Sequence, residues 1–155
     1  MRRSILAGLG TTIPLAGLVL FLVNLPALTR GEFVAAGAFG AAALAAGLPA
    51  ASAGVLVVRT RTASASILLN LSLVFGALVW VGVAWYVASV PHEHGRLWPF
   101  AVLAAGLETA GAFAVGFPAP APGEHSSTVF VAFLKSVGLG LGAAIALSVA
   151  VYLTS

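Results

Sequence analysis

Two ionisable residues lie inside long apolar stretches of the chain, Glu108 in the middle of one stretch and Lys135 near the start of the next. A charged side chain inside a bilayer costs at least about 2–3 kcal/mol on insertion scales, so each should face protein, a partner or water. On consecutive antiparallel helices, the two would lie about 13 Å and about 10 Å from the same membrane boundary. The first hypothesis is therefore an intramembrane ion pair between Glu108 and Lys135.

Two other interpretations of these residues remain open. The long Lys135 side chain could carry its ammonium to the headgroups, with Glu108 satisfied separately. Alternatively, Glu108 could serve as a proton- or ion-coupling site, because desolvation disfavours the charged form of a carboxyl. A lysine close by would favour that charged form, so the ion pair and the proton carrier are competing interpretations.

Small residues accompany both ionisable positions at helical spacing. Gly111 lies three residues after Glu108, and Gly138 and Gly142 form a GxxxG spacing after Lys135. Small residues at this spacing let membrane helices approach closely, so these glycines are predicted to pack helices together. Asn70 and Pro49 could line a path through the membrane, although polar residues in spans more often serve packing.

The sequence contains little that could hold a metal or carry catalysis. His92 and His94 flank Glu93 in a short polar break, which makes them weak candidates for a zinc or copper site. A solvated turn is the simpler interpretation. The chain has no cysteine, and no histidine lies within an apolar stretch, so paired axial haem ligands are missing. We expect no metal, no cofactor and no catalytic constellation, and an enzyme is not favoured.

The elements that must position these residues are membrane-spanning helices. The 155 residues are 61% hydrophobic and 7% charged, with a mean hydropathy of +1.11. Soluble domains are about 45–50% apolar and about 25% charged, so a soluble domain is excluded. A spanning helix needs about 20 apolar residues. Five stretches meet this requirement and predict one all-α domain, 1–155, a bundle of five transmembrane helices with short loops: 4–24, 33–58, 66–90, 97–117 and 128–153.

Two of these spans have alternative interpretations. Pro49 lies inside 33–58, where it removes a backbone hydrogen bond, so we expect one kinked helix. The alternative ends the helix near Gly47 and makes the remainder a re-entrant segment. The first span resembles a signal peptide, but its apolar run is longer than that of a cleavable signal, which favours an uncleaved helix.

The distribution of arginines predicts the orientation. With the amino terminus in the cytoplasm, Arg2, Arg3, Arg59 and Arg61 lie inside, whereas only Arg30 and Arg96 lie outside. Cytoplasmic segments carry the excess of cations, so a cytoplasmic amino terminus is predicted. The alanine-rich, cysteine-free composition is typical of a multi-pass protein of a prokaryotic plasma membrane.

These observations favour a non-catalytic role. We expect an accessory or assembly subunit of a membrane complex, in contact with the lipid bilayer and with a protein partner or further copies of itself. The alternative is a small oligomeric ion- or proton-coupled transporter or channel protomer, with a path around Glu108, Asn70 and Pro49. Nucleic acid is not an expected partner, since the pI near 10.2 arises from a net charge of only +3.

Overall fold

The computed structural model describes residues 30–89, 98–116, 118–119, 122–123 and 125–154, together with Ile5, Gly8 and Thr12. This part of the chain is helical and contains no strand. It forms α2 (Arg30–Thr60), α3 (Ala63–Ser89), α4 (Trp98–Val115) and α5 (Ser126–Thr154). Each helix is long and apolar enough to cross a membrane. The described part of the chain is therefore all-helical, and its four long apolar helices are typical of a multi-pass membrane protein.

Four of the five predicted spans correspond to these helices. The other predicted span, 4–24, falls outside the described residues apart from Ile5, Gly8 and Thr12, each of which is helical. The fifth span stays a prediction. The cytoplasmic amino terminus also stays a prediction, because length and hydropathy do not reveal which end of a helix faces the cytoplasm.

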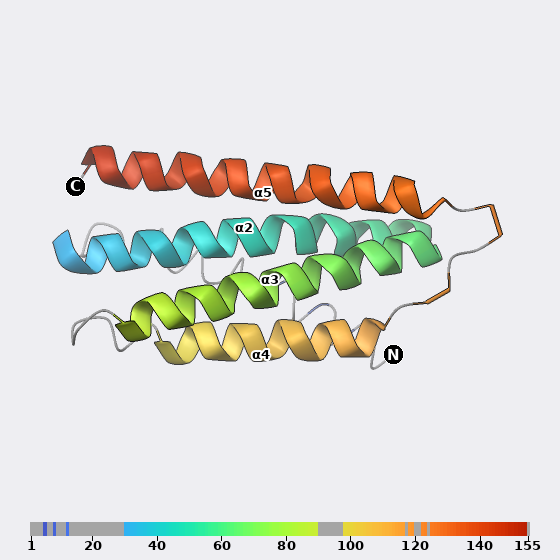
Figure 1. Ribbon diagram of the computed structural model, residues 1–155, viewed down its shortest axis with the longest axis horizontal. Helices are drawn as coiled ribbons and strands as arrows, with labels where there is room; N and C mark the ends of the chain where they lie inside the picture. The colour runs from blue at the N-terminus through green and yellow to red at the C-terminus, as the bar shows by residue number, and fades with distance from the viewer. Residues whose placement is uncertain are drawn as a thin grey trace.

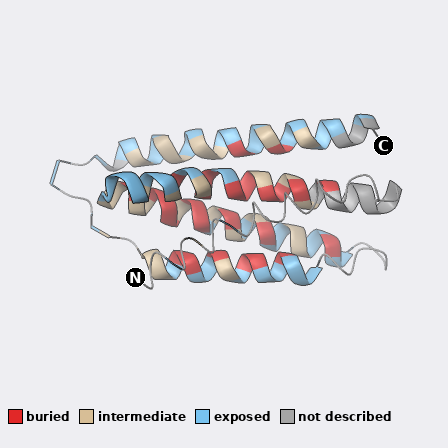
Figure 2. Ribbon diagram, turned by 180° about the vertical axis from the view of Figure 1, so that it is seen from behind, coloured by how far each residue is buried: buried red, intermediate tan, exposed pale blue. Residues whose placement is uncertain are grey.

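The four helices run up and down as antiparallel neighbours (Figure 1). Helix α3 packs against both α2 and α4, and α5 packs mainly against α2. Buried residues gather on the facing sides of α2, α3 and α4, whereas α5 is exposed along most of its length (Figure 2). The core that positions the candidate site therefore lies between α2, α3 and α4.

The turn between α2 and α3 is shorter than the sequence suggests. The predicted spans 33–58 and 66–90 leave seven residues between them, but only Arg61 and Thr62 lie between the helices. Arg61 adopts a positive φ of 52°. The Thr62 hydroxyl then accepts a hydrogen bond of 3.3 Å from the amide of Ala65 and caps the start of α3. A single capping threonine makes this two-residue connection possible.

Helix α2 continues through Pro49 without interruption. The alternative in which the helix ends near Gly47 is therefore wrong, since one helix extends from Arg30 to Thr60. Proline has no N–H, so the carbonyl of Ala45, one turn earlier, lacks the donor that it would normally have in a helix. Pro49 is fully buried, and Gly140 of α5 lies against it.

The contact between α5 and α2 depends on the missing side chain of Gly140. A Cβ atom at this position would lie 2.8 Å from the Ala45 oxygen and 3.1–3.2 Å from the Pro49 ring. Such distances are too short for a methyl group. The absence of a side chain thus lets the backbone of α5 approach the part of α2 where proline has removed a hydrogen bond, a geometry that favours Cα–H···O contacts.

Replacing Gly140 with alanine should therefore destabilise the bundle. The added methyl group must push α5 away from α2, and overpacking of this kind costs about 1–3 kcal/mol. Thermal unfolding in detergent micelles measures the effect. Gly142→Ala is the matched control, because a Cβ there meets no atom within 4 Å. Equal stability of the two variants would contradict the Gly140 contact.

Candidate functional site

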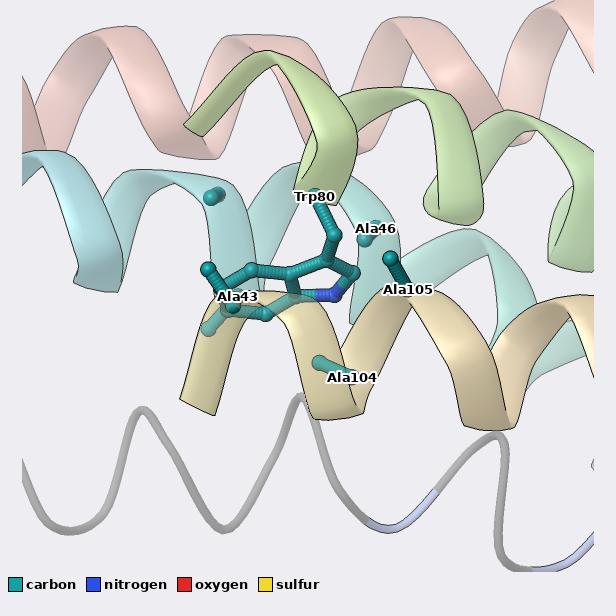
Figure 3. Packing of buried hydrophobic residues seen from close by; sticks show 7 residues of the cluster. Ala43, Ala46, Trp80, Ala104 and Ala105 are labelled. Carbon is teal, nitrogen blue, oxygen red and sulfur yellow. The ribbon is translucent and has the colours of Figure 1, made fainter. Parts of the chain in front are cut away.

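A single large side chain, Trp80 of α3, fills the space between three helices. It is fully buried among alanines, and the ring of Phe39 lies at a centroid distance of 4.8 Å. Figure 3 shows the indole inserted between α2 and α4. The alanines of this cluster are Ala42, Ala43 and Ala46 of α2 and Ala101, Ala104 and Ala105 of α4. Their small size leaves room for the indole, which is how α2, α3 and α4 come together.

Glu108 lies on the same face of α4, one turn beyond Ala104 and Ala105. Its side chain is fully buried against α3, where it meets Gly76. A Cβ atom on Gly76 would lie 2.6 Å from the Glu108 Cδ atom and 2.9 Å from Oε1. The carboxyl group therefore occupies the space that any larger residue at position 76 would need.

The Glu108 carboxyl has no hydrogen-bond partner among the described residues. Both of its oxygens are buried and unpartnered, and so is the indole nitrogen Nε1 of Trp80. Trp80 is close enough to interact electrostatically with the carboxyl. Their geometry nevertheless falls short of a hydrogen bond. An acceptor group and a donor group thus lie near each other in an apolar core, where an unsatisfied polar group costs about 1–3 kcal/mol.

A second buried polar side chain joins α3 to the end of α4. The Asn70 amide Nδ2 donates a hydrogen bond of 2.6 Å to the carbonyl of Ala112, which also accepts one of 2.9 Å from the amide of Gly116. Gly116 has a φ of +64° and ends α4 in a left-handed conformation. Asn70 therefore fastens the last turn of α4 to α3.

Asn70 also lines a groove of about 390 Å³ between α3 and α4. The walls of the groove are almost entirely apolar, and Val74, Leu78 and Phe113 on its rim are exposed. Pro49 does not line this groove, because its ring packs against Gly140. Of the two predicted path-lining residues, Asn70 borders this groove and Pro49 does not, and a path for ions through these residues stays a prediction.

The structure does not bring Glu108 and Lys135 together. Glu108 is buried between α4 and α3, whereas Lys135 is exposed on α5, which packs mainly against α2. No ion pair joins the two in the described part of the chain, and the Glu108 oxygens are unpartnered. The helices are arranged so that α3 rather than α5 covers Glu108.

The predicted packing glycines divide into two groups. Gly111 is buried in α4, in keeping with its predicted role in helix packing. Gly138 and Gly142 are exposed on α5, and a Cβ at either position would meet no atom within 4 Å. Gly140 of α5 does make a close contact, with α2. It lies on the face of the helix opposite to Gly138 and Gly142.

Sequence reasoning missed Gly76, Trp80 and Gly140. Gly76 and Trp80 are four residues apart, so they lie on one face of α3. A glycine beside a tryptophan in a helix otherwise rich in bulky residues was the available signal for this site. No comparable signal distinguished Gly140 from Gly138 and Gly142, since the three alternate along one helix.

The histidine candidates give no metal site in the described residues. His92 and His94 lie in the segment 90–97, which is outside the described residues. His125 is exposed, and its ring nitrogen Nδ1 lies 3.3 Å from the carbonyl oxygen of Gly123. Within the part of the chain that the structure covers, no group of three histidine or acidic residues could hold an ion.

Comparison with known proteins yields no relative. No family model matches the chain, and no curated protein or solved structure is significantly similar to it.

Proposed function

We propose that this protein is a non-catalytic assembly subunit of a membrane complex and that α5 contacts a different membrane protein. The supporting observation is that the outward face of α5 is exposed among the described residues. In the apolar segment of α5, only 11% of the residues are buried, compared with 33–44% in the corresponding segments of the other three helices. Gly138 and Gly142 lie on this face, where an added Cβ would meet none of the described atoms within 4 Å. A GxxxG spacing that packs against none of the described helices is suited to packing a helix of another protein.

The position of Lys135 indicates what kind of partner fits this face. Lys135 lies three residues before Gly138 and is exposed on the same side of α5. A parallel two-fold contact between copies of this chain would bring two Lys135 ammonium groups together. The Glu108 carboxyl, buried against α3, is not available to neutralise them. A different protein with an acidic or strongly polar group at this depth is the better match.

Bulky residues on this face should release the protein from its complex. We expect the wild-type protein, extracted from its native membrane in mild detergent, to migrate in a species larger than the monomer. The double variant Gly138→Leu with Gly142→Leu should migrate as a monomer, because two isobutyl groups keep the partner helix at a distance. Native gel electrophoresis followed by detection of a tag measures the change.

The matched control places the same bulk on other helices. Gly82 of α3 and Gly106 of α4 are also exposed, with no atom within 4 Å of a Cβ. The variant Gly82→Leu with Gly106→Leu should stay in the complex. A monomeric wild-type protein would refute the proposal, and so would a complex that contains only copies of this chain.

A further inference from the structure

We propose that the Glu108 carboxyl, held between Gly76 and Trp80, is an exchangeable proton site rather than a site for a metal cation. This inference goes beyond assembly and does not depend on it. A proton site is also the property that the alternative role, a proton-coupled transporter, would require.

No charged side chain on the described faces of the neighbouring helices neutralises the Glu108 carboxylate. The side chain is fully buried, and both oxygens lack a partner among the residues that the structure describes. The charged and titratable side chains described on the neighbouring helices are Tyr86 of α3, Arg59 of α2 and Lys135 of α5, and each is exposed. None of them faces the carboxyl. A permanent carboxylate here would be an uncompensated charge in an apolar interior, which is strongly unfavourable.

The gap between the carboxyl and the backbone of Gly76 has room for a proton and not for a metal ion. Hard cations such as Ca²⁺ and Mg²⁺ take six or more oxygen ligands, at about 2.0–2.6 Å. At this site the carboxyl supplies two oxygens and lies against the bare backbone of Gly76, where even a methyl group does not fit. The Trp80 indole, which interacts with the carboxyl, is a hydrogen-bond donor and cannot ligate a cation. A proton needs only one oxygen and almost no volume.

The Trp80 N–H gives the site a second stable state. When the proton leaves, the O–H bond of Glu108 breaks, its electron pair stays on the oxygen, and the proton passes to water. The remaining carboxylate can then accept a hydrogen bond from the unpartnered indole N–H, a charge-assisted bond that is stronger than a neutral one. Both forms of the carboxyl are thus accommodated in one pocket, so the proton can exchange.

The composition of the chain allows a direct test. Its acidic residues are Glu32, Glu93, Glu108 and Glu124. The triple variant Glu32→Gln, Glu93→Gln, Glu124→Gln therefore retains Glu108 as its one side-chain carboxyl. With glutamate labelled with ¹³C at Cδ, the protein in lipid nanodiscs should give one carboxyl resonance from glutamate. This resonance should move between the acid and carboxylate positions on a one-proton curve as the pH is raised.

A second readout reports the contact with Trp80. In the variant Trp85→Phe with Trp98→Phe, Trp80 is the remaining tryptophan, and both replaced residues are exposed. Its fluorescence should increase along the same pH curve, because a carboxylic acid quenches a neighbouring indole more strongly than a carboxylate does. Adding Glu108→Gln to this variant should abolish the change.

Two results would overturn the proposal. A ¹³C resonance that stays at either position over the whole pH range would mean that Glu108 exchanges no proton. A resonance that moves when Na⁺, K⁺, Mg²⁺ or Ca²⁺ is added at constant pH would identify a metal-cation site. Both measurements use the isolated protein. A negative result would therefore refute the proton site without bearing on whether α5 binds a partner.

Discussion

Replacing Trp80 with alanine is expected to lower the free energy of unfolding by about 3 kcal/mol. Truncation of a buried tryptophan costs about 3–5 kcal/mol in soluble cores, from lost transfer energy together with the cavity that remains. In a bilayer the lost packing contacts dominate, because lipid is as apolar as the core, so the lower end of that range applies. The neighbours of Trp80 are alanines, which cannot extend into the cavity.

Trp85 provides the matched comparison for this prediction. It lies on the same helix, but its side chain is 78% exposed. Trp85→Ala should change stability by no more than about 0.5 kcal/mol, as is usual for surface substitutions. Denaturation in detergent micelles, followed by circular dichroism, compares the two variants. Equal losses would show that the indole of Trp80 does not hold α2, α3 and α4 together.

The second large loss of stability is expected from Gly76→Val. A valine side chain would occupy the position of the Glu108 carboxyl, so either the carboxyl or the whole of α4 must move. Overpacking costs about 1–3 kcal/mol and occasionally more. The upper end applies here, because Glu108 is fully buried and surrounded by helices. The midpoint of thermal unfolding should fall accordingly.

Removing the Glu108 side chain should recover part of the lost stability. The double variant Gly76→Val with Glu108→Ala removes the carboxyl and offers its space to the valine, so it should be more stable than Gly76→Val alone. Gly82→Val, on the same helix but in open surroundings, should have little effect. If Glu108→Ala does not improve the Gly76→Val variant, the two residues are not in contact.

Hydropathy predicted the helices well and their arrangement poorly. Apolar stretches of about 20 residues determine where helices form in a bilayer, so the described helices lie within a few residues of the predicted spans. Which helices become neighbours depends on side chains that complement each other across the bundle, such as Trp80 with the alanines of α2 and α4. The fit between side chains on different helices cannot be deduced from the sequence of one helix alone.

The same distinction applies to the candidate site. Glu108 was recognisable from the sequence because a carboxyl in an apolar stretch is costly wherever it lies. Its surroundings were not, since the choice of Lys135 as its neighbour rested on equal depth and adjacency in the chain. Helix α3 covers Glu108 instead, because Gly76 leaves a recess that fits the carboxyl.

The meeting of Pro49 and Gly140 has a consequence for biogenesis. Helices enter the membrane in the order of their synthesis, so α2 is inserted well before α5 exists. During this interval the Ala45 carbonyl, which Pro49 leaves without its helical donor, has no α5 backbone against it. Helix α5 therefore covers a polar group left open in the earlier α2, and a nascent chain halted before α5 should be a preferred substrate for membrane quality control.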